Sequence, residues 1–131
     1  MPGIDECLLE TMRLPGALGA ALVDWTSGLA LGTIGDPPGG DHEAAAAEAA
    51  EFARNVAEHP VFVTGTPGTA GGPALPEDVL VTTHVGYHLL HFVETAFDSS
   101  VFLYLWLDRD LGNLALARLR MRNLAERLVL V

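Results

Sequence analysis

Three histidines that lie close together are the first candidates for a chemical site in this chain. They are His84, His88 and His91. A metal site needs ligands that converge on one point. In an extended strand, His88 and His91 project from opposite faces because their separation is odd, and His84 lies across a turn near Val85-Gly86. The spacing therefore favours ordinary strand and surface histidines, and we predict no metal site.

Four aspartates could supply paired carboxylates for acid–base chemistry. They are Asp24, Asp98, Asp108 and Asp110. Asp98 is predicted to lie in a turn, and Asp110 stands where a helix cap belongs. These positions favour capping and turn roles over catalysis.

The sequence also contains no convincing catalytic nucleophile or phosphate-binding loop. Ser27, Ser99 and Ser100 have no G-x-S-x-G context. Cys7 has acidic neighbours, which raise the pKa of a thiol. The run GTPGTAGG at 65–72 resembles a phosphate loop, but such a loop needs a lysine, and the chain contains none. We therefore expect no enzyme, no catalytic residue and no bound cofactor.

The composition is that of one domain with a partner. The chain has 131 residues, half of them apolar, and a mean hydropathy of +0.31, which suggests a surface buried against another protein. The longest apolar run, Val101 to Leu107, is far shorter than the roughly 20 residues of a membrane helix. The start of the chain has no basic region ahead of an apolar stretch, and Cys7 is the single cysteine. We therefore expect no signal peptide, no membrane insertion and a cytoplasmic location.

The charge is strongly acidic and unevenly distributed. The net charge is −10, and all seven basic residues are arginines. This balance argues against nucleic acid and anionic membranes as the main partners. Five of the seven arginines lie between Arg109 and Arg127, which makes the last predicted helix a local basic strip.

The elements that must position these side chains follow the order α-β-β-α-β-β-β-α. Helices are predicted over 2–14, 42–58 and 111–130, and strands over 17–25, 29–34, 79–83, 87–95 and 101–107. Short turns between consecutive strands predict a five-stranded antiparallel sheet, an α/β (α+β) fold. Strand 101–107 is apolar at every position, so it should be central, with helices on both faces of the sheet. Segment 59–76, rich in glycine and proline, is expected to be a flexible surface loop within the single domain 1–131.

The middle helix, 42–58, contains the run EAAAAEAAEFA, and Asp41 can cap its start. At about 100° per residue, its polar side chains fall on one arc. That arc comprises Glu43, Glu48, Glu51, Arg54, Asn55 and Glu58.

The apolar remainder of the middle helix has two edges. The bulkier edge, which we expect to pack on the sheet, comprises Phe52, Ala45, Val56 and Ala49. The other edge comprises Ala46, Ala50, Ala53 and Ala57. Small side chains let two helices approach closely, so this alanine edge predicts pairing with the same helix of a second copy about a two-fold axis. The alternative is a helix of high propensity that packs only within its own domain.

The last helix also has two apolar stripes. The core side is predicted to comprise Leu114, Ala117, Met121, Leu124 and Leu128. A weaker stripe of Leu116, Leu119 and Leu130 is flanked by Arg120, Arg122 and Arg127. Either the first helix covers this second stripe, or it is exposed for an adaptor function.

Four stretches in this order resemble the Roadblock/dynein light chain superfamily, which includes bacterial MglB-like proteins. They are LPGALGAALVDWTSGLALGTIG, the alanine helix after an acidic residue, VLVTTHVGYHLLHFVE, and VFLYLWLDRDLGNLALARLRM. The resemblance covers most of residues 8–128. The glycine- and proline-rich segment 59–76 is longer than the family's usual connection.

The resemblance implies one helix on one face of the sheet and two on the other. It also implies a dimer in which the middle helices pair and the following strand pairs with its copy. The interface would comprise Ala46, Ala49, Ala50, Ala53, Ala57, Val79, Val81 and Thr83.

The resemblance further implies partners. Family members bind or regulate small Ras-like GTPases, often across the paired helices, or act as adaptors, and some are encoded beside a sensor kinase. The polar arc of the middle helix would then be the partner-binding surface. Three hypotheses follow: a dimeric, non-enzymatic GTPase regulator, a structural adaptor in a sensor-kinase complex without nucleotide sensing, or a small-molecule sensor domain.

Overall fold

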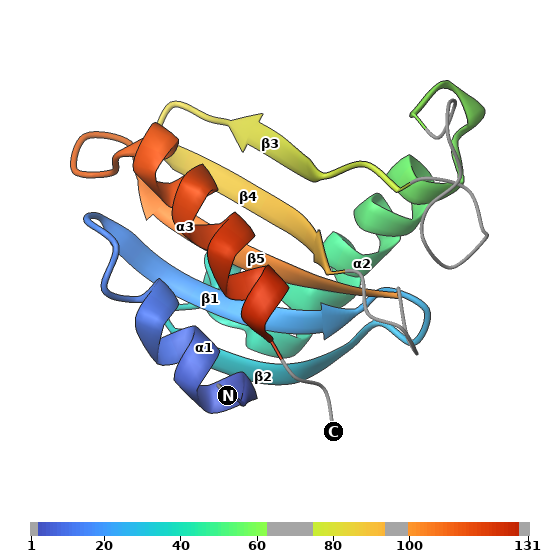
Figure 1. Cartoon of the computed structure of the whole chain (residues 1–131), viewed down its shortest axis with the longest axis horizontal. Coiled ribbons are helices and arrows are strands. Elements are labelled where there is room, and N and C mark those ends of the chain that lie inside the picture. The colour runs from blue at the N-terminus through green and yellow to red at the C-terminus, as the bar shows by residue number, and fades with distance from the viewer. Residues whose placement is uncertain (1–2, 63–74, 94–99, 129–131) are drawn as a thin grey trace.

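The computed structural model describes residues 3–62, 75–93 and 100–128, and it places a five-stranded sheet between two layers of helix (Figure 1). The α-helices are α1 (Ile4–Thr11), α2 (His42–Glu58) and α3 (Leu114–Arg127), with 3-10 turns η1 (Pro38–Gly40) and η2 (Pro60–Phe62). The strands are β1 (Ala17–Asp24), β2 (Leu29–Gly35), β3 (Asp78–Thr82), β4 (Gly86–Val93) and β5 (Val101–Asp108). The predicted fold class and element order are confirmed.

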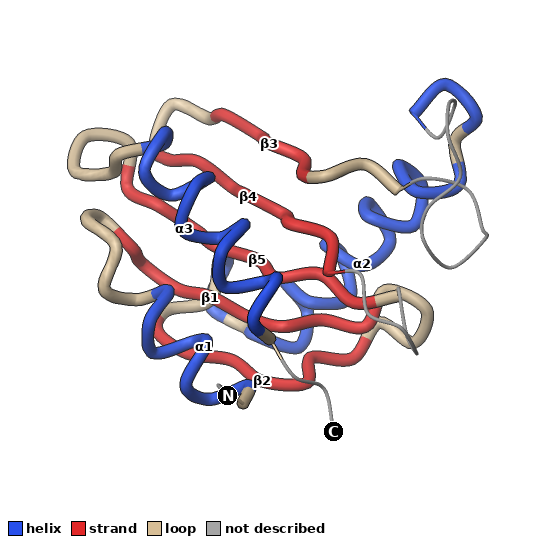
Figure 2. Tube along the Cα trace, viewed as in Figure 1, coloured by secondary structure: helices blue, strands red, loops and turns tan. Residues whose placement is uncertain are grey.

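The sheet has the order β2-β1-β5-β4-β3, and every neighbouring pair is antiparallel (Figure 2). The fully apolar strand β5 is therefore central, as predicted, while β2 and β3 form the two edges. The pairing of β1 with β2 shifts between Leu22 and Val23, where a bulge leaves Leu31 without a Cα partner.

Helices α1 and α3 cover one face of the sheet, and α2 lies on the other (Figure 1). Every second residue of a strand faces the α1/α3 layer, and leucines occupy many of these positions. Leu22, Leu89 and Leu103 are fully buried there. The core side predicted for α3 is confirmed, because Ala117, Met121, Leu124 and Leu128 are buried and Leu114 is partly so. Leu116 is also half-buried against this core.

The packing of α2 is the reverse of the prediction. Ala46, Ala50, Ala53 and Ala57 face the chain's own sheet, and Ala53 is 0% exposed, whereas Phe52 is 40% exposed. The reason lies in the sheet, which presents large side chains to α2, notably Phe92, Phe102 and Tyr104. These rings already fill the space beneath the helix, so only methyl groups fit between helix and sheet.

Helix starts follow local capping. Asp41 caps α2 as predicted, because its Oδ1 accepts a hydrogen bond from Glu43 N at 2.9 Å. The expected cap at Asp110 is wrong: α3 starts at Leu114, and Asn113 caps it by accepting from the backbone of Leu116. Asp108 is the cause, because its Oδ2 accepts from the backbone N–H groups of residues 110 and 111 and closes a turn before the helix.

Several sequence features lie outside the described residues. They include the run GTPGTAGG, Thr95, Asp98, Ser99 and Leu130. Within the ranges that the structure describes, no helix is long and apolar enough to cross a membrane.

Candidate functional site

Those candidate chemical groups of the sequence that the structure describes do not converge. His88 and His91 lie on opposite faces of β4, as their odd separation predicts, and His84 is exposed in the turn between β3 and β4. Asp24 sits at the end of β1 and accepts hydrogen bonds from the backbone and hydroxyl of Thr26. Within residues 3–62, 75–93 and 100–128, no group of three or more potential ligands could hold a metal ion.

The single cysteine is buried and is not placed to react as a nucleophile. Cys7 in α1 lies in the α1/α3 core, where Thr11 Oγ1 donates a hydrogen bond to its backbone oxygen at 2.8 Å. Burial raises the pKa of the Cys7 thiol. A thiol of this kind is a weak nucleophile at neutral pH.

The main candidate for a functional surface is the part of the sheet that α2 does not cover. Helix α2 lies mainly over β2 and β1, while the same face of β3, β4 and β5 borders a cleft of about 350 Å³. We call this part the open half-face, and it comprises Val81, His88, Leu90, Tyr104 and Trp106. Leu90 and Tyr104 are buried at its inner margin, where they also contact the alanines of α2, and Trp106 lies beside His88 on the same face. Val81 is 37% exposed, so a large apolar side chain meets solvent here.

The wall of the cleft is one edge of α2. Phe52 stands there with Ala45 and Ala49, and Glu48 lies at the same margin. We call Ala45, Ala49 and Phe52 the outer edge of α2. It is apolar, and it faces the open half-face instead of filling it.

Aromatic rings line the open half-face. The ring of His88 lies 5.9 Å from that of Tyr104 and 6.1 Å from that of Trp106, with interplanar angles of 21° and 7°. His88 Nδ1 and Tyr104 Oη are 2.5 Å apart. Sequence reasoning did not single out this cluster, although aromatic residues at every second position of β5, at 102, 104 and 106, could have signalled it.

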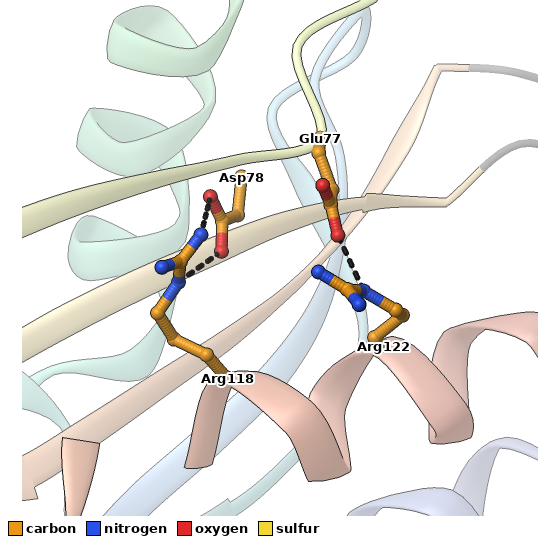
Figure 3. A network of polar contacts seen from close by, with 4 residues as sticks. All are labelled: Glu77, Asp78, Arg118 and Arg122. Carbon is orange, nitrogen blue, oxygen red and sulfur yellow. Dashed lines mark hydrogen bonds and ion pairs between the residues drawn. The ribbon is translucent and has the colours of Figure 1, made fainter. Parts of the chain in front are cut away.

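Strand β3 lies at the edge of the sheet beside β4 (Figure 2), and among the described strands it is hydrogen-bonded to β4 alone. Two ion pairs from α3 hold its start on the opposite face of the sheet (Figure 3). The Arg118 guanidinium binds both carboxylate oxygens of Asp78, at 2.8 and 3.1 Å, and Arg122 Nε binds Glu77 Oε1 at 2.5 Å. The free edge of β3 is thereby held in place by contacts that leave it open.

The predicted interface residues divide into two groups. Ala46, Ala50, Ala53 and Ala57 are buried against their own sheet, so the expectation that their side chains meet a second copy is wrong. Ala49, Val79 and Val81 border the cleft or its strand and remain candidates. Thr83 remains one too, but it lies in the turn after β3, where its hydroxyl bonds to Gly86.

The polar arc of α2 points away from the sheet. Its members Glu43, Glu48, Glu51, Asn55 and Glu58 are exposed, and Arg54 is half-buried. Within the described part of the chain, none of the six takes part in a side-chain ion pair. Among the residues that the structure describes, these side chains therefore have no ionic partner within their own chain.

Comparison with solved structures identifies the fold of the chain. Neither protein-family models nor curated protein sequences gave a match. Among solved structures, the chain is similar to MglB of Myxococcus xanthus, with a TM-score of 0.73 and 16% identity over 94% of this chain and 82% of that one. It is similar to a Roadblock/LC7 domain from Streptomyces avermitilis, with a TM-score of 0.67 and 20% identity over 95% and 93%.

A third match is the gliding protein MglB of Thermus thermophilus, with a TM-score of 0.71 and 20% identity over 94% of this chain and 83% of that one. The chain therefore has the Roadblock fold, as the sequence resemblance implied.

Proposed function

We propose that two copies of this chain associate through the open half-face, the outer edge of α2 and the free edge of β3. The observation that carries this proposal is the position of an exposed apolar surface directly beside β3, an edge strand that pairs with β4 on one side among the described residues. A monomer that exposed both would be prone to uncontrolled association.

A two-fold arrangement satisfies both features together. If β3 pairs with the β3 of a second copy, the two sheets become continuous, and unpaired backbone groups gain partners. The two α2 helices then lie side by side. The α2 of each copy covers the open half-face of the other copy. Ala45 and Ala49 allow a close approach, and Phe52 supplies apolar area.

We further propose that the dimer is a non-enzymatic regulator that binds a small Ras-like GTPase across the paired α2 helices. The support is the sequence resemblance together with the unengaged polar arc. In a dimer, four glutamates and one arginine from each arc, Glu43, Glu48, Glu51, Glu58 and Arg54, would be repeated on one surface. Such a surface favours a partner with a basic contact region.

The dimer is tested by Phe52→Glu, which places a charge on the outer edge of α2. Its matched control is Leu119→Glu, because Leu119 is 53% exposed on the opposite layer of the molecule. Size-exclusion chromatography with light scattering should give a dimer mass for the control and a monomer mass for Phe52→Glu. A monomeric parent chain, or a Phe52→Glu variant of unchanged dimer mass, would contradict the proposed interface.

GTPase binding is tested by a pull-down against a small Ras-like GTPase of the same genome, loaded with GDP or with a GTP analogue. Charge reversal at Glu48 and Glu51 should reduce capture while the dimer mass stays unchanged. Absence of binding in both nucleotide states would remove the GTPase proposal and leave the dimer untouched.

One observation favours the second candidate, a structural adaptor. Leu119 is exposed on α3, whereas Leu116 packs against the core. A partner that docks on α3 would be lost in Leu119→Glu and retained in Phe52→Glu. This pattern is the opposite of that expected for docking across α2.

A further inference from the structure

We propose that His88 makes the association of two copies depend on pH, so that the dimer holds at neutral pH and loosens as His88 takes up a proton. This inference rests on the dimer proposed above. The added claim is that protonation of His88, at the centre of the open half-face, sets the affinity of the dimer.

The surroundings of His88 suit a neutral imidazole. Burial raises the pKa of the Tyr104 hydroxyl far above neutral, so this phenol keeps its proton. The phenol can then donate its hydrogen bond to His88 Nδ1, which must carry no proton to accept it. A proton on Nδ1 would end this arrangement and force the hydroxyl to turn.

Few charged groups face His88. From β5 it meets Tyr104 and Trp106, and from β3 it meets the apolar Val81. The turn η1 adds backbone and proline, and α2 brings one carboxylate to the cleft, that of Glu48, which is exposed. Within the described residues, no carboxylate lies within ion-pair distance of His88.

A second copy would make the environment of His88 more apolar. The group placed over it would be the outer edge of α2, which is built of alanine and phenylalanine. The carboxylate that α2 brings to the cleft, that of Glu48, is exposed at the margin of this edge. Burial already lowers the pKa of His88 in the single chain. Further burial lowers it more, because a charged imidazole loses solvation while the carboxylate of Glu48 stays exposed to solvent at the margin.

The sign of the effect follows from these pKa differences. His88 in the dimer has a lower pKa than His88 in separated copies, so association releases protons. The dimer is therefore strongest above the pKa of the separated copies and weakens as the pH falls through that value. Because each copy carries one His88, the dissociation constant can rise by up to about a hundredfold per pH unit below it.

The carboxylates of the chain act in the opposite direction. The chain carries 17 aspartate and glutamate residues and a net charge of −10. Protonation of carboxylates in acid reduces repulsion between two acidic copies and tightens association. A loosening between pH 7.5 and 5.5 therefore cannot come from the carboxylates.

The test measures the dimer dissociation constant by analytical ultracentrifugation at pH 7.5, 6.5 and 5.5 and constant ionic strength. The dissociation constant of the parent chain should be more than threefold higher at pH 5.5 than at pH 7.5. His88→Gln, which is neutral and can still bond to Tyr104, should remain dimeric with a dissociation constant that changes less than threefold. Circular dichroism at each pH shows whether the fold is retained.

Two matched controls locate the effect. His84→Gln removes an exposed histidine of the β3–β4 turn, and His91→Gln removes a buried one on the other face of β4. Both should keep the pH dependence of the parent. A dimer whose stability is independent of pH, or whose pH dependence is lost in His91→Gln rather than His88→Gln, overturns the role of His88 and leaves the dimer standing. A monomer at every pH removes both proposals.

Discussion

Ala53 gives the sharpest test of how α2 is packed. Its side chain is 0% exposed and lies in the cluster with Phe92, Phe102 and Tyr104. Ala53→Leu would add three carbon atoms to a layer that the rings already fill. Overpacking of this kind typically costs about 1–3 kcal/mol.

The expected loss can be followed by urea and thermal unfolding monitored by circular dichroism. For a domain of this length, a loss of 1 kcal/mol lowers the melting temperature by about 3–5 °C, so the variant should melt about 3–15 °C below the parent. Ala47→Leu is the matched control, because Ala47 lies on the same helix and is exposed. The control should stay close to the parent, since leucine and alanine are both good helix formers.

Two results would contradict this account of α2. If Ala53→Leu unfolds at the same urea concentration as the parent but changes from dimer to monomer by light scattering, the methyl of Ala53 faces a second copy and not the sheet. If both leucine variants are equally destabilised, the loss comes from the helix itself and not from packing against the rings.

Three further predictions use other contacts of the fold. Asp41→Ala should lower the free energy of unfolding by about 1 kcal/mol through loss of the α2 cap, while Asp36→Ala, at an exposed position, should change it little in the same urea titration. Arg118→Ala should cost about 0.2–1 kcal/mol and speed hydrogen exchange at the β3 amides, an effect that 1 M salt reproduces in the parent, whereas Arg120→Ala should leave β3 exchange unchanged. Cys7 should react with a disulfide reagent at pH 8 far more slowly in the native chain than in urea, and equal rates would show that its thiol is not buried in the α1/α3 core.

The elements were predictable because local signals agree. The uninterrupted apolar run of β5 required cover on both faces, and Thr26-Ser27-Gly28 marked the first hairpin turn. Asp41 marked the start of α2 because an aspartate there can accept from the free N–H groups of the first turn. At the start of α3, three aspartate or asparagine residues competed for this role, and the first of them, Asp108, closed a turn that delayed the helix.

The surface of α2 was predictable only in part. The polar arc followed from the helical period, since polar side chains seek solvent whatever lies beneath. The choice between the two apolar edges did not follow, because it depends on side-chain volume in strands distant in sequence. Phe52 was expected to anchor the helix, yet Phe92 and Phe102 already occupy that layer and displace it to the margin.

The bulge in β2 bears on how large an assembly of this chain can become. Beside Leu31 the outer edge of β2 loses the regular spacing that another strand would need, whereas β3 at the opposite edge pairs with β4 in unbroken register. A sheet with two regular edges could add copies without end and grow into a fibre. With one edge made irregular, the proposed strand addition at β3 would use up the single regular edge of the described sheet in each copy, and growth of the sheet would stop at a pair.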